Sequence, residues 1–160
     1  MAFIYYVTHI QFEAGAIKLL KQECERVGIS RPLIITDQGV KAAGILQKAL
    51  DNLLGMTVVV FDQTPSNPTE AAVRAAAASY KASHCDGLIA VGGGSSIDCA
   101  KGVAIAATHE GPLTTYATIE GGSLLITDRA APLIAVPTTS GTESEVARGA
   151  ILIVDDHRKL

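Results

Sequence analysis

The stretch GLIAVGGGSSIDCAK, residues 87–101, places three glycines between an apolar run and two serines. The apolar run predicts a strand over 87–93, and the residues after the serines predict a helix over 97–109. Ser95 or Ser96 has the side chain to cap this helix. Since glycine costs backbone entropy, a glycine triplet indicates that another group approaches the backbone closely.

An anion is one candidate for the approaching group. A helix N-terminus offers unpaired N–H groups and a partial positive charge, and glycines let a phosphate reach the backbone. The alternative is a tight strand-to-helix turn without a ligand. The loop lacks the GK[ST] of a Walker A motif and the third glycine of GxGxxG, where Ile97 stands. The residues that would hold a phosphate or pyrophosphate are Gly92, Gly93, Gly94 and Ser95.

On both sides of this stretch, apolar runs alternate with segments of helical spacing. Further strands are expected over 32–37, 56–62, 131–139 and 149–156, and further helices over 16–28, 40–55 and 70–84. Gly28 and Gly55 suit the ends of the first two of these helices, and Thr69 suits the start of the third. Residues 111–131 are expected to form a loop with a short helix. Apolar strands separated by helices predict an α/β fold with a parallel sheet covered on both faces.

The composition excludes several classes of protein. The chain has 160 residues, 48% of them hydrophobic, which is typical of a globular domain and not of a disordered one. A formal net charge of -3 and the absence of a basic patch give no support for a nucleic-acid partner. No apolar run is long enough to span a membrane, and the N-terminus does not resemble a signal peptide. Three cysteines without CxxC spacing predict reduced thiols in a cytoplasmic protein.

Ligands of parallel α/β sheets bind at the carboxyl ends of the strands, and polar residues follow several of the predicted strands. Asp37 could accept a hydrogen bond from a ribose hydroxyl, or it could simply cap the next helix. The segment VPTTSGTESE, residues 136–145, crowds hydroxyls into one loop. Thr142 and Glu145 have the spacing of a capping box, which explains only part of that loop.

Other polar residues carry weaker signals. Asp98 lies in a first helical turn, where a negative charge is stabilising without any ligand. Lys101 is expected to be solvated rather than to bind a ligand. No nucleophile elbow or cysteine–histidine pairing supports hydrolysis. The four histidines have no metal-ligand spacing and are expected on the surface or in loops; they are His9, His84, His109 and His157.

Four motifs taken together resemble the iron-containing, group III, metal-dependent alcohol dehydrogenases. They are TD at 36–37, PSNPT at 65–69, GGGSSIDCAK at 92–101 and PTTSGTESE at 137–145. The family carries GGGSxxDxAK, PNPT and PTTxGTGSE motifs at similar spacing, and the resemblance covers essentially the whole chain. It implies a Rossmann-like parallel sheet with helices on both faces, with residues 1–160 as one dinucleotide-binding domain.

The resemblance also implies a cofactor and the residues that contact it. NAD is favoured over NADP, because Asp37 would repel a 2′-phosphate. Gly93, Gly94 and Ser95 would hold the pyrophosphate, and Asn67 would lie on the adenosine side. The full set of implied cofactor-binding residues is Asp37, Asn67, Gly93, Gly94, Ser95, Asp98, Thr138, Thr139, Thr142 and Lys159.

Two departures from the family pattern affect the expected activity. Glu143 stands where the family mostly has glycine, which places a carboxylate near the expected phosphate site. The family's metal ligands, one aspartate and three histidines, belong to a helical C-terminal domain beyond the position of Leu160. We therefore expect Fe²⁺ or Zn²⁺ and a small alcohol or aldehyde substrate in a complete enzyme, with no metal ligand and no catalysis in these 160 residues. No catalytic residue is assigned.

Other interpretations remain open at this point. One is a stand-alone nucleotide-binding module, or a truncated product without catalysis. Another is a lactaldehyde or maleylacetate reductase, or a relative of glycerol dehydrogenase or dehydroquinate synthase, although PTTSGTESE favours the alcohol dehydrogenases. Because strand ends that would face a second domain are expected to be open, we also expect a homo-oligomer. It would form through that exposed patch, or through pairing of the N-terminal segments as in the family's dimers.

Overall fold

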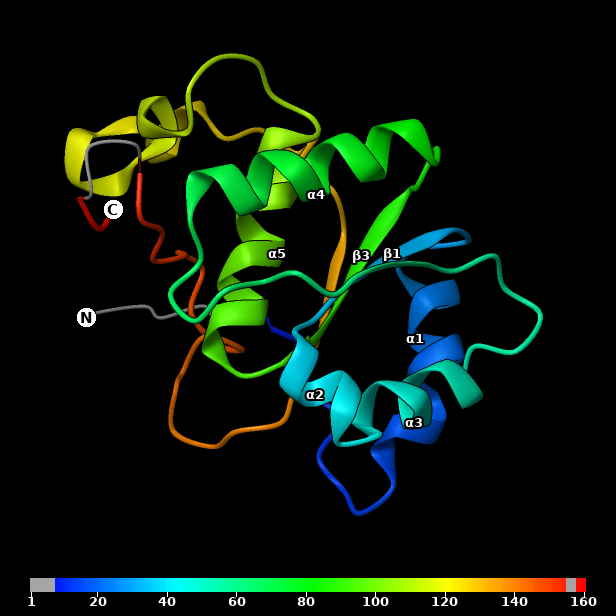
Figure 1. Ribbon diagram of the computed structural model, residues 1–160. Coiled ribbons are helices and arrows are strands. Elements are labelled where there is room, and N and C mark those ends of the chain that lie inside the picture. Colours follow the sequence, from blue (N-terminus) through cyan, green and yellow to red (C-terminus); the bar gives the residue numbers. More distant parts are fainter. Residues whose placement is uncertain (1–7, 155–157) are drawn as a thin grey trace, which may run out of the picture.

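The computed structural model describes residues 8–154 and 158–160, which form a parallel sheet with helices on both faces (Figure 1). The strands are β1 (Pro32–Ile35), β2 (Val59–Phe61), β3 (Gly87–Gly92) and β4 (Leu133–Pro137). They lie in the order β2-β1-β3-β4, and every neighbouring pair is parallel. The predicted fold class and four of the five predicted strands are confirmed.

Helices from different parts of the chain cover the two faces of the sheet. One face carries α1 (Leu20–Arg26), α2 (Gln38–Ala42) and α3 (Ile45–Asp51). The other face carries α4 (Glu70–Ala82) and α5 (Gly94–Ala106), as Figure 1 shows. Since both faces are covered, β1 and β3 are buried along their whole length, which explains their uninterrupted apolar sequences.

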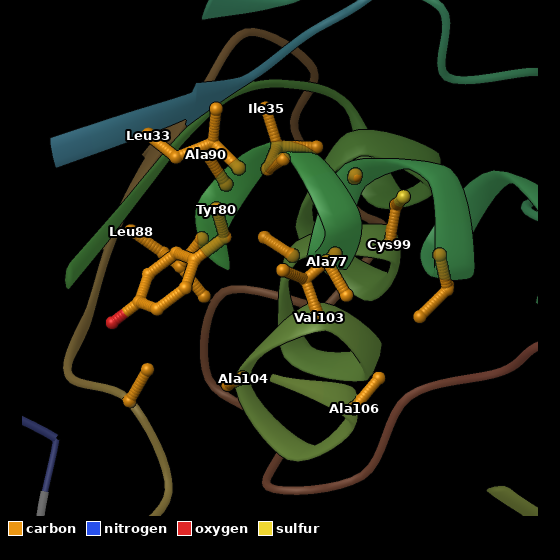
Figure 2. Close-up of a cluster of buried hydrophobic side chains, with 14 of the residues drawn as sticks. Leu33, Ile35, Ala77, Tyr80, Leu88, Ala90, Cys99, Val103, Ala104 and Ala106 are labelled. Carbon is orange, nitrogen blue, oxygen red and sulfur yellow. The ribbon is translucent and has the colours of Figure 1, made fainter. Parts of the chain in front are cut away.

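Alternate residues of each central strand belong to two separate cores. Leu33 and Ile35 of β1 pack with α4 and α5, whereas Ile34 packs with α1 and α3 on the other side. Figure 2 shows the first core, in which Leu88 and Ala90 of β3 face the two helices. This two-residue period is the pleat of the strand, so it fixes the register of the sheet.

Three of the predicted helices differ in detail from the expectation. The helix expected over 97–109 is α5, which begins and ends three residues earlier. The segment 40–55 forms two short helices because Gly44, with φ 72°, adopts the left-handed conformation between α2 and α3. The segment 16–28 begins with a 3₁₀ turn, Ala16–Leu19, before α1. Gly28 ends α1 in the left-handed conformation, as predicted, with φ 78°.

The predicted strand over 149–156 is wrong for the residues described. Ile153 forms only isolated bridges, to Thr69 and to Lys159, and does not extend the sheet. Leu152 is buried in the core shared by α4 and α5, and Gly102 of α5 leaves the space for it. The apolar side chains of this segment therefore pack against the helices instead of forming a strand. The last two residues of the predicted strand, 155 and 156, lie outside the described part of the chain.

The irregular segment predicted over 111–131 contains three short 3₁₀ helices: Leu113–Tyr116, Thr118–Glu120 and Gly122–Leu125. His109, expected on the surface or in a loop, lies in the loop after α5, where it is buried at 6% exposure and anchors this segment. Its Nε2 accepts a hydrogen bond from the backbone N–H of Thr127 at 3.0 Å. In the described part of the chain, no helix combines the length and apolar character needed to cross a bilayer.

The strand order places a topological switch point between β1 and β3. The chain runs from β1 outward to β2, and then returns to the other side of β1 to form β3. The connections that leave the carboxyl ends of these two central strands therefore diverge to opposite faces. A crevice opens between such connections, which is where doubly wound sheets bind ligands.

Candidate functional site

A cavity of about 650 Å³ lies at this switch point. It is lined by four connections that leave the carboxyl ends of the strands, so residues far apart in sequence meet there. The lining residues are Asp37, Gln38, Gly39 and Val40 after β1; Asp62, Gln63, Thr64, Pro65 and Ser66 after β2; Gly93, Gly94 and Ser95 after β3; and Thr138 and Thr139 after β4.

Side chains of the protein itself lie close to all three glycines of the triplet. A Cβ at Gly92 would lie 2.7 Å from Ser96 Cβ, and one at Gly93 would lie 3.2 Å from Thr139 Oγ1. A Cβ at Gly94 would lie 3.0 Å from Ser144 Oγ. The loop after β4 therefore packs closely against Gly93 and Gly94, and the same two glycines also line the cavity.

The N-terminus of α5 opens into the cavity. The helix begins at Gly94, and no side chain in the described part of the chain caps it, so the prediction that Ser95 or Ser96 caps this helix is wrong. The Ser95 hydroxyl instead accepts the backbone N–H of Asn67 at 3.2 Å. Because the first N–H groups of a helix have no acceptor within it, the first turn of this 13-residue helix offers donors and a partial positive charge to the cavity.

Asp37 lies at the junction of β1 and α2, and of its two alternative roles the structure shows the helix cap, whereas the contact with a ribose hydroxyl stays a prediction. Its Oδ1 accepts the backbone N–H of Val40 at 2.9 Å, so it caps α2. Its Oδ2 accepts the hydroxyl of Ser96 at 3.3 Å. Asp37 also lines the cavity, which leaves the rest of its acceptor capacity available to a ligand.

Sequence reasoning missed a second carboxylate in the cavity. Asp62 follows β2 and accepts a hydrogen bond from Lys41 Nζ at 2.5 Å. This bond lowers the pKa of Asp62 below its ordinary value. The cavity thus combines a positive helix terminus with two carboxylates, one of them paired; the only available signal for Asp62 was its place directly after an apolar strand.

Only some residues of the threonine-rich loop line the cavity, and others pack behind its wall. Thr138 and Thr139 line the cavity, whereas Thr142 lies behind Gly94 and donates its hydroxyl to Glu145 at 3.3 Å. Glu143 is exposed, outside the cavity lining, and has φ 61°. Glycine adopts this left-handed conformation at a lower energetic cost than glutamate. The backbone conformation therefore explains why the family that the sequence resembles mostly has glycine at this position.

Lys101 holds the segment after this loop and is not a solvated lysine. Its Nζ donates to the carbonyls of Ser144 at 2.6 Å, Ala147 at 2.8 Å and Gly149 at 2.7 Å. Burial lowers the pKa of Lys101, and the nearby carboxylate of Asp98 opposes that effect. The expectation that Lys101 is solvated is therefore wrong, because its hydration is replaced by backbone carbonyls.

Asp98 lies on the same side of α5 as Lys101, with 3.7 Å between Oδ1 and Nζ. Its Oδ2 accepts the backbone N–H of Ile151 at 3.2 Å. Asp98 is buried and does not line the cavity. Its observed contacts support the segment around residue 150, and its predicted contact with a cofactor stays a prediction.

Asn67 and Lys159 meet although 92 residues separate them. Lys159 Nζ donates to Asn67 Oδ1 at 3.1 Å. Asn67 has φ 59°, a conformation that asparagine tolerates better than most residues, and its backbone N–H reaches Ser95. The pair lies beside the cavity lining rather than in it, so its predicted contact with a cofactor also stays a prediction.

The cysteines offer no reactive nucleophile. Cys24, Cys85 and Cys99 are free and buried. Burial raises the pKa of Cys24 and of Cys99 to about 11, and it raises that of Cys85 as well. These thiols are therefore protonated at neutral pH and behave as small apolar side chains.

A metal centre is not formed by the described residues. Within residues 8–154 and 158–160, no three His, Cys, Asp or Glu side chains come together in a way that could hold a metal ion. His9 and His84 are exposed, His109 is occupied by Thr127, and His157 lies outside the described residues.

A parallel sheet with its cavity at the switch point defines a doubly wound α/β protein. More specifically, the chain belongs to the iron-containing alcohol dehydrogenase family, whose model matches residues 7–160. It is 72% identical, over all of its 160 residues, to 42% of the 4-hydroxybutyrate dehydrogenase of Cupriavidus necator. The resemblance inferred from the four motifs is confirmed.

Solved structures agree with this assignment. A crystal structure of 1,3-propanediol oxidoreductase matches 99% of the chain with a TM-score of 0.89 and 37% identity, over 42% of that protein. The sulfoacetaldehyde reductase of Bifidobacterium kashiwanohense, solved in complex with NAD+, matches 99% with a TM-score of 0.86 and 28% identity, also over 42% of its length. The chain therefore spans about two fifths of the length of these relatives.

Proposed function

We propose that residues 1–160 are the dinucleotide-binding domain of a metal-dependent alcohol dehydrogenase, and that the domain binds NAD(H). One observation carries the proposal: the uncapped N-terminus of α5 and the carboxylate of Asp37 line the same cavity at the switch point. A dinucleotide matches this pair, because its pyrophosphate is an anion and its ribose presents hydroxyl donors.

The polarity of the cavity supports NAD over NADP. The pyrophosphate would lie against the backbone N–H groups of Gly94 and Ser95, where the helix dipole is positive. Asp37 would accept ribose hydroxyls and repel a 2′-phosphate, and Asp62 adds further negative charge. Thr138 and Thr139 would line the groove toward the nicotinamide. When bound, the nicotinamide ring accepts or returns a hydride, which is chemistry that the protein itself cannot supply.

The proposal is tested by titrating NADH and NADPH into the 160-residue chain and following nicotinamide fluorescence. We expect saturable binding of NADH and weaker binding of NADPH. Asp37→Asn keeps a cap for α2 but removes the negative charge, so this variant should bind NADPH more tightly than the parent. If the folded chain binds neither dinucleotide, the proposed function is wrong.

We propose that the complete protein oxidises a small alcohol or reduces the corresponding aldehyde. Membership of the family and the dehydrogenases and reductases among the similar proteins support this reaction class. The described residues supply no ligand set for iron or zinc, so no metal-dependent step is assigned to them. We expect the 160-residue chain alone to show no alcohol oxidation with added Fe²⁺ or Zn²⁺, and measurable turnover would contradict this.

We further propose that the domain is cytoplasmic and self-associates. Three free, buried thiols suit a reducing compartment. Several large apolar side chains are exposed around the 3₁₀ segment, with Leu124 at 92%, Ile119 at 75% and Ile151 at 62%. Light scattering of the dilute protein is expected to give a mass above that of the monomer, and a monomer would contradict self-association.

A further inference from the structure

Ser96 is a buried residue whose hydroxyl reaches the candidate cofactor-selecting carboxylate. It is the third residue of α5, and its side chain has no exposed surface. Its Oγ lies 3.3 Å from Asp37 Oδ2, and since an ionised carboxylate only accepts, Ser96 donates this bond. A hydrogen bond thus links the first turn of one helix to the N-cap of another.

The surroundings hold the Ser96 hydroxyl in this position. Gly92, at the end of β3, lies so close that a Cβ there would be 2.7 Å from Ser96 Cβ and 3.5 Å from Asp37 Oδ2. The absence of a side chain at Gly92 therefore creates the space in which serine and aspartate meet. Alanine at position 92 would overlap Ser96 Oγ and force this bond apart.

Two bonds orient the carboxylate of Asp37. Oδ1 accepts the N–H of Val40 at 2.9 Å, and Oδ2 accepts the Ser96 hydroxyl. The bond to Val40 alone would leave the carboxylate plane free to tilt about that contact, whereas a bond to each oxygen fixes the plane. A carboxylate has about four acceptor positions, so about two remain for a ligand in the cavity.

We propose that Ser96 is a positioning residue for cofactor selection. It holds the Asp37 carboxylate so that its remaining lone pairs face the cavity, where they select a dinucleotide with a free ribose diol over one with a 2′-phosphate. This inference rests on the proposed NAD-binding function. It predicts that Ser96, which need not touch the cofactor, changes the preference between NADH and NADPH.

The test measures the dissociation constants of NADH and NADPH for the 160-residue chain and its Ser96→Ala variant. A bond to a charged group that orients a binding residue corresponds to about tenfold in affinity. We expect the dissociation constant of NADH to rise about tenfold and that of NADPH to change by less than about twofold, because NADPH gains nothing from an oriented Asp37. An equal change for both cofactors would overturn the proposal.

Two further variants separate positioning from a general structural effect. Thr36→Val removes a neighbouring buried bond, from the Thr36 hydroxyl to the Val91 carbonyl at 2.7 Å, and leaves both hydrogen bonds of the Asp37 carboxylate in place. It should lower stability while keeping the ratio of the two constants. In an Asp37→Ala background, Ser96→Ala should no longer change the ratio, and a change that persists there would also overturn the proposal.

Folding and binding failures are distinguished by separate measurements. Circular dichroism establishes that each variant is folded, and if Ser96→Ala is not, Ser96→Cys replaces the hydroxyl with a weaker donor of similar shape. That variant should shift the cofactor ratio in the same direction by a smaller factor, and an unshifted ratio would count against positioning. If the parent chain binds neither cofactor, the proposed function fails; if the parent binds and the ratio stays constant, only the role of Ser96 fails.

Discussion

Lys101 and Ser144 lie 43 residues apart in sequence, and the lysine Nζ donates to the serine carbonyl at 2.6 Å. The same nitrogen also serves the carbonyls of Ala147 and Gly149. These three bonds tie the segment after the threonine-rich loop to α5. Because Ser144 and Thr142 also lie against Gly94, the position of this loop at the cavity depends on the lysine.

Replacing this lysine should destabilise the domain. Lys101→Met keeps an unbranched chain of similar length but leaves three carbonyls without their donor and Asp98 without its nearby cation. We expect a loss of about 2–3 kcal/mol in the free energy of unfolding, measured by urea denaturation. Lys48→Met, at an exposed position of α3, should change stability by no more than about 0.5 kcal/mol. Equal effects of the two variants would contradict this role for Lys101.

The buried thiols should make the domain less stable at alkaline pH. The ordinary thiol pKa is 9.0, and burial raises the pKa of Cys24 and Cys99 to about 11. Between these values the unfolded chain releases thiol protons that the folded chain retains, so stability falls as pH rises from 9 toward 11. The urea midpoint measured from pH 7 to 11 should follow this fall.

Lys101 has the opposite effect on the pH dependence of stability over part of the range from pH 9 to 11. Burial lowers its pKa from 10.5, so just below that pH the unfolded chain binds more protons and stability gains with rising pH. Because two thiols have large pKa shifts, we expect their loss of stability to exceed the gain from the single lysine. The double variant Cys24→Ala/Cys99→Ala should therefore show a shallower alkaline fall, and an unchanged slope would show that other groups cause it.

Gly102 tests the contact between α5 and its neighbours. Alanine is the better helix former by about 1 kcal/mol, yet a Cβ here would lie 2.9 Å from Cγ2 of the fully buried, β-branched Val73. We expect Gly102→Ala to lose about 1–2 kcal/mol overall, measured by thermal or urea unfolding. Gly149→Ala is the control, since no atom of the described residues lies within 4 Å of its added Cβ, and it should be nearly neutral. A stabilised Gly102→Ala would mean that the helices separate easily.

Glu143 offers a stabilising substitution. Its φ of 61° is left-handed, which costs a non-glycine residue about 1 kcal/mol. Glu143→Gly should therefore raise the free energy of unfolding by about 0.5–1 kcal/mol. Glu143→Ala removes the same charge but keeps the backbone cost, so it should show no such gain. If both variants stabilise equally, the cause is the carboxylate and not the backbone.

The sheet and its helices could be predicted because their signals are local. Uninterrupted apolar runs at 32–35 and 87–92 reflect burial on both faces, and they needed no knowledge of distant partners. The run containing Leu152 has a similar apolar character, but the space beside Gly102 of α5 places it on helices rather than in the sheet. Gly44 lies within a pattern of helical spacing, and such a pattern does not indicate which glycine adopts the left-handed conformation. The break between α2 and α3 therefore could not be predicted.

The candidate site could be predicted only at the ends of strands. Asp37, the glycines and Thr138 each follow an apolar run, so their convergence at one sheet edge was foreseeable. The roles of Lys101 and His109 were not, because their partners lie 43 and 18 residues away. A lone lysine or histidine in a sequence carries no signal for the backbone groups that a fold brings to it.

The observed cap of α2 and the proposed selection of NAD both involve Asp37, which constrains how this domain could be engineered to accept NADP. The same side chain caps α2 through the N–H of Val40, so a change to alanine would remove the helix cap together with the phosphate repulsion that we propose for Asp37. Serine and asparagine are N-caps of comparable strength without the negative charge. Cofactor redesign should therefore start from these two residues, combined with a new cation near Asp62, rather than from a truncation of the aspartate.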